Sequence, residues 1–514
     1  MRNPIGAAGV LALWLVCGAA QAATFTVTNT NDSGPGSLRE AINLANTGLG
    51  ADTINFGVSG VIILASQLEI TDDLTIDGRG ARIVISGNSR VRVLRAGDRP
   101  GRGCSALTLI KLTIAKGATS GYGGGLYGCG TLNVVDSSFD SNTSGSYGGA
   151  IAYASTYPTT GTNSVNISGS TFHGNSAGEP FLVGNQGGAI YLWVPDPRLP
   201  EPGYVPPPPQ TYTVTNSTFS RNFLISRCDI FPCHGNAIHV EGRSSDKLVI
   251  TNSTLALNNL ATAGIQQWAV NTSVTEVVFR NTILANSPGR NCPSPSPDPR
   301  WITRITDGGG NLSSDASCGF SEPSSVNSTD AQLGPLRDNG GPTLTMAPLS
   351  GSPAIDLGVN AVAVDSAGVP LATDQRGVGF ARIFPSGGTV DRGAIEVAGF
   401  RFAGFFRPIE NFPILNLTKA GASVPVRFSL NGYQGMAIFA AGSPYSQDVV
   451  CEKGSATNGV EEPVVENGNG LSYDATTDQY QFVWRTEKSW QAACRNLILK
   501  FSDGTVREAL FQFK

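Results

Sequence analysis

Two short sequence motifs, or words, recur along the middle of this chain, always in the same order. The first is FxxN and the second is GGAI, and three successive copies of the pair occupy residues 139–151, 172–190 and 219–238. The second word has diverged to GNAI in the third copy. Each FxxN follows a β-branched phrase, such as the VNISGST that ends at Thr171. The period is irregular, but the ordered recurrence indicates an internal repeat, which strongly limits the folds open to the chain.

Short β-branched segments separated by Gly, Asn and Ser cannot each bury an apolar face alone, whereas stacked neighbours can. In a parallel β-solenoid each coil lies about 4.8 Å from the next, so equivalent residues form columns. The repeat therefore predicts that Phe139, Phe172 and Phe219 lie over one another in the core, with the Ile of each GGAI in a second inward column. We expect the Asn of each FxxN to hydrogen-bond along the stack and the glycines to form tight corners.

The paired words resemble the repeats of the chlamydial polymorphic outer-membrane proteins over residues 105–290. That resemblance implies a right-handed parallel β-helix and a role in adhesion. Insertions between the words, such as the Pro-rich segment 195–209, are expected to leave the coil as stiff, extended loops.

The N-terminus has the pattern of an export signal. Arg2 precedes an apolar run over residues 5–16, and the AQA at residues 20–22 fits a cleavage site. Residues 1–22 are thus expected to be a signal peptide, and the mature protein to be secreted or held at the cell surface. Lipidation of Cys17 is a less favoured alternative, because a Val precedes it where a small residue is expected. No later stretch is apolar over the roughly 18 residues that a membrane helix needs, so we expect no transmembrane segment in the mature chain.

Of nine cysteines, eight follow the signal segment, and an even number favours disulfides in an oxidising compartment. Their spacing suggests pairs of neighbours: Cys104 with Cys129, Cys228 with Cys233, Cys292 with Cys318, and Cys451 with Cys494. Other pairings stay open from sequence alone. Because the chain has no CxxC pair and no His/Cys cluster with zinc spacing, we expect structural bridges and no metal site.

Residues 29–46 depart from the β pattern. Ser37 and Glu40 have the spacing of a capping box. The apolar residues that follow at helical spacing are Leu38, Ala41, Ile42 and Ala45. We expect a short amphipathic helix that covers the first coil, whose edges would otherwise be unpaired. The segment resembles the CSLREA domain of bacterial secreted proteins, with Gly36 where that name has Cys, which is consistent with a structural role.

Residues 331–398 contain the ordered phrases LGPLRDNGG, SGSPAIDLG, TDQRG and DRGAIE. Together they resemble the choice-of-anchor Q region of bacterial surface proteins, which implies the end of the β-helix. The segment also holds charged residues that suggest a carboxylate site: Asp338, Asp356, Asp374, Arg376 and Asp391. In a region this rich in Gly-Gly and Ser-Pro turns, we favour the interpretation that they satisfy turn backbones and each other.

After residue 398 polar and apolar residues alternate. Val424, Val426 and Phe428 share one face of SVPVRFSL, and Asp503-Gly504 fits a hairpin turn between later alternating segments. We therefore expect an antiparallel β-sandwich, and the segment resembles the bacterial PxKF domain. The expected organisation is a signal peptide (1–22), a β-helix with its N-terminal cap (23–330), its choice-of-anchor Q-like end (331–398) and the PxKF-like sandwich (399–514).

Composition and motifs restrict the function. A formal net charge of −4 supplies no basic field, so nucleic acid is not an expected partner. Right-handed β-helices often cut polysaccharides, and a hydrolase would need paired carboxylates or other acid–base groups. However, His173, His234 and His239 lie in no GHG motif, and the adjacent Asp72-Asp73 fits an early turn. No catalytic residue is assigned, and an enzyme is the less favoured alternative.

Alternation along the GGAI strands predicts which side chains point outward. If the Ile of each word points inward, with Ile265 continuing the column, the residues one and three positions later share an outer face. On that register successive coils carry an aromatic and polar stripe: Tyr191, Trp193, His239, Glu241 and Trp268. Such a stripe suits stacking on sugar rings or docking of a protein. In the competing interpretation, these aromatic residues pack beneath the Pro-rich insertion.

We therefore expect an all-β protein with a right-handed parallel β-helix, a short N-terminal capping helix and a C-terminal antiparallel β-sandwich. Its expected role is adhesion or glycan binding at the cell surface or outside the cell, as a monomer without cofactors, with a glycan or a surface protein as partner. Two alternatives stay open. One is a polysaccharide lyase or glycoside hydrolase of the pectin-lyase-like β-helix type acting along the stripe, and the other is a structural spacer.

Overall fold

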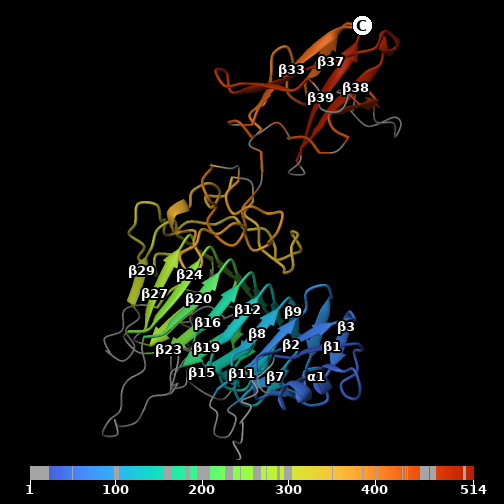
Figure 1. Ribbon diagram of the computed structural model, residues 1–514. Coiled ribbons are helices and arrows are strands. Elements are labelled where there is room, and N and C mark those ends of the chain that lie inside the picture. The colour runs from blue at the N-terminus through green and yellow to red at the C-terminus, as the bar shows by residue number, and fades with distance from the viewer. Residues whose placement is uncertain are drawn as a thin grey trace, which may run out of the picture. The chain divides into compact units, whose positions relative to one another are not determined.

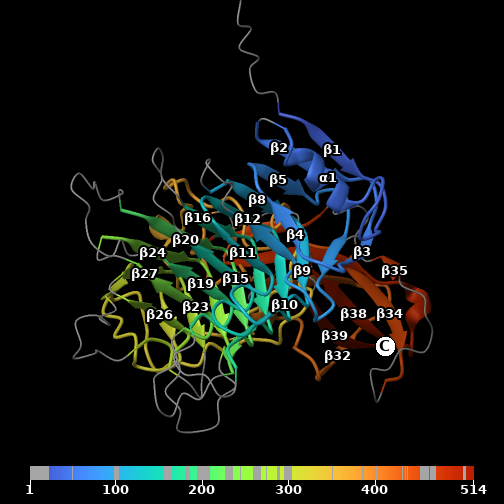
Figure 2. The ribbon, with the colours of Figure 1, turned by 90° about the horizontal axis from the view of Figure 1, so that it is seen from below.

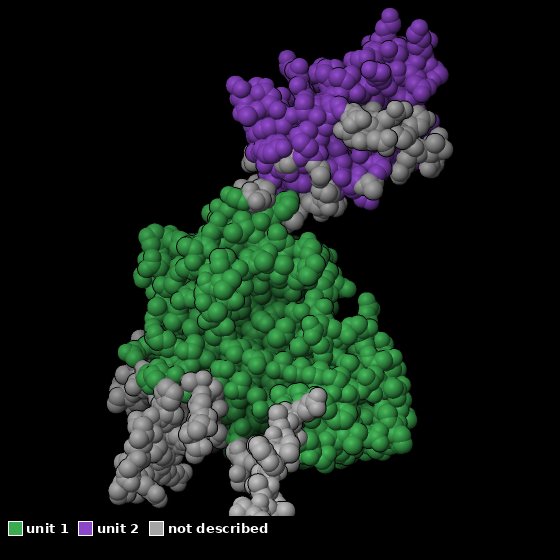
Figure 3. Space-filling model, viewed as in Figure 1, with its two compact units in different colours: residues 1–396 green, residues 397–514 purple. Residues whose placement is uncertain are grey.

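The computed structural model describes residues 22–514 apart from 49, 98–103, 155–163, 180–185, 194–208, 226–234, 243–244, 259–267, 274, 286–289, 294–303, 350, 385–386, 398, 401, 431, 435, 437, 441, 452–461, 464–469 and 502–504. The predicted signal peptide, except for Ala22, thus lies outside the described residues. The chain forms two compact units, residues 1–396 and residues 397–514 (Figure 3). Within the described ranges, no helix is both long enough and apolar enough to cross a membrane.

Unit 1 is a parallel β-helix whose strands stack coil upon coil in four sheets (Figures 1 and 2). Sheet A contains, in spatial order, β1 (Thr24–Val27), β2 (Asp52–Phe56), β5 (Leu74–Asp77), β8 (Leu107–Ile110), β12 (Leu132–Val135), β16 (Val165–Ser168), β20 (Thr211–Thr215), β24 (Lys247–Thr251), β27 (Glu276–Arg280) and β29 (Arg304–Asp307). Sheet B contains β3 (Gly60–Ile63), β6 (Ile83–Ser86), β9 (Leu112–Ala115), β13 (Ser138–Asp140), β17 (Thr171–His173), β21 (Thr218–Ser220), β25 (Thr254–Ala256), β28 (Ile283–Ala285) and β30 (Leu312–Ser313).

Sheets C and D complete each full coil, which runs from C through A and B to D. Sheet C contains β26 (Val270–Ser273), β23 (Ile238–Glu241), β19 (Ile190–Trp193), β15 (Ile151–Ala154), β11 (Leu126–Cys129), β7 (Leu94–Ala96) and β4 (Leu68–Ile70). Sheet D contains β10 (Ala118–Thr119), β14 (Thr143–Ser144), β18 (Ser176–Ala177) and β22 (Phe223–Leu224). All pairings within these sheets are parallel, so the repeat is a solenoid, as the sequence predicts.

The phenylalanines of the FxxN words form a column in the core. Phe139 is in register with Phe172, and Phe172 with Phe219. The successive ring centroids are 5.1 Å and 4.6 Å apart, the rings are nearly parallel, and all three side chains are fully buried. This stack confirms the predicted core column and fixes the orientation of the neighbouring outward residues of sheet B.

The asparagines of the same words form a second, hydrogen-bonded column. The Nδ2 of Asn142 donates to Oδ1 of Asn175, and Nδ2 of Asn175 donates to Oδ1 of Asn222, each at 2.9 Å. Asn222 continues the ladder to Asn258 at 2.8 Å. Each Oδ1 of the last three also accepts the backbone N–H of the preceding asparagine. Buried amides are thereby satisfied at every turn, as buried polar groups must be.

The GGAI glycines make the corner that leads into sheet C. Gly187 has a φ of +69°, and a Cβ on it would lie 2.3 Å from the carbonyl oxygen of Ile190. A side chain at this corner is therefore excluded both by backbone conformation and by space. This explains why the word recurs at equivalent corners.

Helix α1 (Leu38–Ala45) caps the first coil. The Ser37 Oγ accepts the N–H of Glu40 at 3.2 Å, and Glu40 Oε2 accepts the N–H of Gly36 at 2.6 Å. The four predicted apolar positions of the helix are buried, and the helix packs against β1, β2 and β4. The predicted cap is confirmed.

The described residues of 331–396 form turns, isolated bridges and the 3-10 helix η2 (Asn360–Val362), shown in yellow and orange in Figure 1. They hydrogen-bond to outward threonines of sheet B, namely Thr171, Thr218 and Thr254. Gln375 fastens this segment to the coils. Its Nε2 donates to the hydroxyls of Thr171 and Thr343 at 2.9 and 3.0 Å, and its Oε1 accepts the hydroxyl of Thr218 at 2.6 Å. Because Gln375 is buried, these bonds replace the water that an outer sheet face would otherwise bind.

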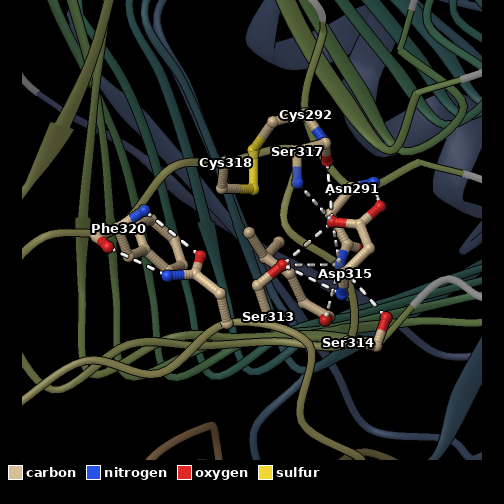
Figure 4. Close-up of a disulfide and its surroundings, with 10 residues drawn as sticks. Asn291, Cys292, Ser313, Ser314, Asp315, Ser317, Cys318 and Phe320 are labelled. Atoms are coloured by element: carbon tan, nitrogen blue, oxygen red, sulfur yellow. Dashed lines mark hydrogen bonds between the residues drawn. A yellow bond between two sulfur atoms is a disulfide. The ribbon is translucent and has the colours of Figure 1, made fainter.

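The last coils are joined by the disulfide between Cys292 and Cys318 and by a partly buried hydrogen-bond network around Asp315 (Figure 4). The Oδ1 of Asp315 accepts bonds from the hydroxyls of Ser313 and Ser317, and its Oδ2 accepts the N–H of Asn291 at 3.0 Å. The predicted pairs Cys104–Cys129 and Cys451–Cys494 are also confirmed. The predicted pair Cys228–Cys233 lies outside the described residues.

Unit 2 contains two sheets, which are mostly antiparallel. Sheet E contains β31 (Gly404–Phe406), β33 (Ser423–Ser429), β37 (Gln479–Arg485) and β36 (Ser472–Asp474). Sheet F contains β32 (Leu415–Thr418), β39 (Val506–Phe513), β38 (Cys494–Lys500), β34 (Tyr445–Val449) and β35 (Glu462–Pro463), and only its β32–β39 pair is parallel. The 3-10 helix η4 (Lys488–Trp490) precedes β38.

The predicted alternation of SVPVRFSL is present in β33. Val424, Val426 and Phe428 are buried, whereas Ser423 and Arg427 are exposed. The Asp503-Gly504 hairpin falls outside the described residues. The predicted fold class is confirmed: the chain is all-β apart from α1 and short 3-10 helices, with a right-handed parallel β-helix, a capping helix and a C-terminal antiparallel β-sandwich.

Candidate functional site

Sheet C brings four of the five predicted stripe residues together. Tyr191 of β19 is in register with His239 of β23, and Trp193 is in register with Glu241. Ile190 and Ile238, one position earlier, are in the core. The inward Ile column and the outward stripe thus follow the alternation that the sequence predicts for these two coils.

The strand register predicted from the sequence is wrong at Trp268. Val270, and not Ile265, pairs with Ile238, so Asn271 takes the position beside His239. Trp268 lies before β26, where its carbonyl accepts the N–H of Asn236 at 2.7 Å, and its side chain is buried. The error arose because this coil lacks a GGAI word, so nothing local marks where the strand starts.

Tyr191 is mostly buried, with 6% of its surface exposed. Its hydroxyl donates to Oε2 of Glu241 at 2.6 Å, and its ring stacks on Trp193 at 5.2 Å and on His239 at 5.8 Å. Burial and the negative charge of Glu241 raise the pKa of the Tyr191 phenol well above its usual value. The phenol therefore stays protonated and holds the Glu241 carboxylate in place.

His239 is fully buried. Its ring cannot meet a substrate in this conformation, which argues against an acid–base role for His239 with Glu241. Of the four residues brought together, Trp193 and Glu241 are the ones with accessible side chains.

A wider aromatic cluster surrounds Trp193. The Trp193 ring lies 6.0 Å from Tyr122 and 6.2 Å from Tyr127, with interplanar angles of 30° and 19°. Tyr147 contacts both Tyr122, at 5.4 Å, and Tyr191, at 4.8 Å. We call these five rings the aromatic face: Tyr122, Tyr127, Tyr147, Tyr191 and Trp193. They span three coils, and Tyr122 is 39% exposed.

Two small residues allow these rings to meet. Tyr191 and Trp193 are in register with Ala152 and Ala154 of β15, which in turn are in register with Tyr127 and Cys129. The methyl side chains of β15 leave space through which Trp193 reaches Tyr127, two strands away. Close packing of the rings therefore depends on the small size of Ala152 and Ala154.

A charged border continues the same sheet face. Arg95 of β7 is in register with Tyr127 and with Glu69 of β4, and its Nη1 lies 3.4 Å from Glu69 Oε2. Arg92 lies over the Tyr127 ring, 5.1 Å from its centroid, and donates to the carbonyl oxygens of Tyr122 and Gly123. Burial lowers the pKa of the Arg92 guanidinium. Arg92 thus fixes the turn that presents Tyr122.

Sequence reasoning missed Tyr122 and Tyr147 as members of this site. A signal existed, because each directly precedes a Gly-Gly pair, at residues 123–124 and 148–149. Residues at equivalent corners of adjacent coils lie one above the other, so the shared YGG word predicts two stacked rings.

The charged residues of the segment 331–396 act as turn and core partners. Asp338 accepts the N–H of Gly340, and Asp374 binds the guanidinium of Arg376. Asp356, Asp391 and Glu396 offer carboxylate oxygens within 4.8 Å of one another, and Oε2 of Glu396 accepts from buried Arg382 at 3.1 Å. Burial and the charge of Asp391 raise the pKa of Glu396 to about 8. These contacts support the interpretation that the set is structural.

No protein-family model matches the chain. No curated protein matches it either. Among solved structures, the chain is similar to jun a 1, the major allergen from cedar pollen, with 18% sequence identity and a TM-score of 0.29 over 55% of this chain and 76% of the allergen chain. No residue role is transferred from that similarity. The repeat and domain families named from the sequence stay predictions.

Proposed function

We propose that this protein is an exported glycan-binding protein that acts in adhesion, and that the aromatic face is its binding surface. The observation that carries the proposal is the packing of Tyr122, Tyr127 and Trp193 as nearly parallel, partly exposed rings on one sheet face. The apolar C–H face of a sugar ring packs on an aromatic ring, while its hydroxyl groups stay in reach of polar neighbours.

The border of the aromatic face supplies those neighbours. Arg95 and Glu69 are each nearly half exposed, so both keep hydrogen-bonding capacity toward a ligand. They lie on the two strands that precede Tyr127 in the stack. Because neighbouring strands are about 4.8 Å apart, a glycan lying along the helix axis would meet the charged pair and then the rings.

Exposed aromatic clusters are uncommon on monomeric proteins without an interaction role. The disulfides of unit 1 and the export signal expected in the sequence agree with a site outside the cytoplasm. Adhesion follows if the chain stays attached to the producing cell.

The test is a binding measurement on a glycan array with the wild-type protein and with two single variants, Tyr127→Ala and Trp193→Ala. Either variant should weaken binding at least tenfold, because each removes one ring of the stack. Phe406→Ala is the matched control, since Phe406 is an exposed aromatic residue on β31 of unit 2. Unchanged affinity in both face variants, with thermal stability preserved, would contradict the proposal.

Cell fractionation tests the location. The protein should be found in the outer fraction or in the medium, and recovery in the cytoplasm would contradict export.

A further inference from the structure

A second concave surface lies on another side of unit 1, where sheet A turns into sheet B. It is a groove of 1370 Å³ between that turn and residues 338–378. One residue per coil at this turn has a left-handed backbone, and Lys111, Asp136 and Asn216 line the groove from such positions. Asn166 and Thr213 add an amide and a hydroxyl, joined at 2.8 Å. The groove thus offers polar groups to an extended chain that crosses several coils.

A side pocket of 310 Å³ lies beside this groove. The two share Thr113, Asp338, Gly341 and Pro342 in their linings, so these residues separate neighbouring cavities. Sheet B supplies one wall of the pocket with Asp140 and His173. The loop around Gly341 supplies the other. A short substituent on a chain in the groove would therefore reach His173.

Asp140 and His173 form an oriented pair. They are in register on β13 and β17, and Nδ1 of His173 lies 2.9 Å from Oδ1 of Asp140. Beneath them, the stacked rings of Phe139 and Phe172 fix both strands. A carboxylate on Nδ1 selects the tautomer in which Nε2 is the basic nitrogen. No described residue hydrogen-bonds to that Nε2.

The opposite wall is equally fixed. Gly341 has a φ of +83°, and a Cβ on it would lie 2.5 Å from the Arg376 main chain, so only glycine fits. Thr343 anchors the loop by donating to the carbonyl oxygen of Gly169 at 2.9 Å. The Gly341 N–H has no acceptor among the described residues. The pocket therefore has the His173–Asp140 pair on one wall and the fixed Gly341 loop on the other.

We propose that this pocket hydrolyses a carboxylic ester carried by a polymer bound in the groove. In this reaction His173 Nε2 takes a proton from water while the water oxygen bonds to the ester carbonyl carbon, and the carbonyl electron pair moves onto its oxygen. The Gly341 N–H donates to that oxyanion. The intermediate then expels the alcohol oxygen, which takes the proton from His173, leaving a carboxylic acid and an alcohol.

Ester hydrolysis fits these groups better than cleavage of a glycosidic bond. The latter needs two available carboxyl groups on either side of the bond. In this pocket Asp140 is held by His173, and Asp338 accepts the N–H of Gly340. Ser138 also lines the pocket but makes no hydrogen bond with the His173 ring, so water is the nucleophile and Asp140 is a positioning residue.

The test measures acid release from p-nitrophenyl acetate and from acetylated xylan by the full-length protein. His173→Gly should lower kcat/KM about 100-fold or more, because a general base contributes that much to such reactions. Added imidazole should restore acid release from acetylated xylan by His173→Gly above the rate that imidazole gives without protein, which a merely structural role of His173 would not allow. Asp140→Asn should lower kcat at least tenfold with KM unchanged.

Lys116→Ala is the control, because Lys116 is an exposed turn residue that lines neither cavity. Its activity should equal that of the wild type. The proposal is overturned if the wild-type protein releases no acid from either ester, or if His173→Gly keeps full activity. Glycan binding by the aromatic face is measured separately with Trp193→Ala, so failure of one proposal leaves the other standing.

Discussion

The side-chain amide of Asn175 donates to Oδ1 of Asn222 and accepts from Nδ2 of Asn142, and none of the three side chains is exposed. Each asparagine also donates to the main chain of the preceding coil, as Asn175 does to the Phe139 carbonyl at 2.9 Å. A single side chain thus links three coils.

Asn175→Ala should destabilise the β-helix by about 2–4 kcal/mol, because the backbone N–H and one side-chain N–H of Asn142 lose their buried acceptor and the Phe139 carbonyl loses a donor. Chemical denaturation followed by circular dichroism measures this change. Asn31→Ala, at an exposed loop position, should change the unfolding free energy by less than about 0.5 kcal/mol. Equal effects of the two substitutions would show that the ladder carries no stability.

The GGAI corner gives a second prediction. Gly187→Ala should lower the free energy of unfolding by more than about 3 kcal/mol. The new Cβ would clash with a backbone carbonyl oxygen, and the positive φ is unfavourable for alanine. Gly351→Ala separates the two causes, since Gly351 has a φ of +84° but open space around it. We expect that control to lose only about 1 kcal/mol. Similar midpoints for the two variants in thermal unfolding would remove the steric part of the argument.

Features that repeat from coil to coil could be predicted from the sequence. The Phe and Asn columns occupy fixed positions in a recurring word, and the capping box of α1 involves residues only three apart. Stacking of Trp193 on Tyr127 could not be predicted in this way, because it depends on the small side chains of the strand between them.

Contacts between residues far apart in the sequence could not be predicted for a different reason. His173 shares its pocket with Gly341, and no local pattern joins residues so far apart in the chain. Trp268 was misplaced because coil lengths vary, and only the inward Val270 sets the register of its strand.

Buried Glu396 makes the stability of unit 1 depend on pH. Its pKa is about 8 in the folded protein, against 4.5 for the free side chain. The folded state therefore binds more protons between these values, and the free energy of unfolding should fall as pH rises from about 4.5 to 8. Glu396→Gln should remove this dependence. The unfolding free energy of the variant minus that of the wild type should be on the order of 1–3 kcal/mol larger at pH 8.5 than at pH 5.5. Parallel pH profiles for the two proteins would refute the assignment.

The last prediction concerns the space beneath Trp193. Ala154 is in register with Trp193 and is almost fully buried, so a larger side chain there occupies the volume through which the indole reaches Tyr127. Ala154→Leu should turn Trp193 away from the tyrosines, which near-ultraviolet circular dichroism detects as a changed aromatic signal. Glycan binding should weaken at least tenfold with it. Ala285→Leu makes the same enlargement at a half-buried position of sheet B and should leave both signals unchanged. If Ala154→Leu binds glycans as tightly as the wild type does, then the ligand does not require the stacked arrangement of Trp193 and Tyr127.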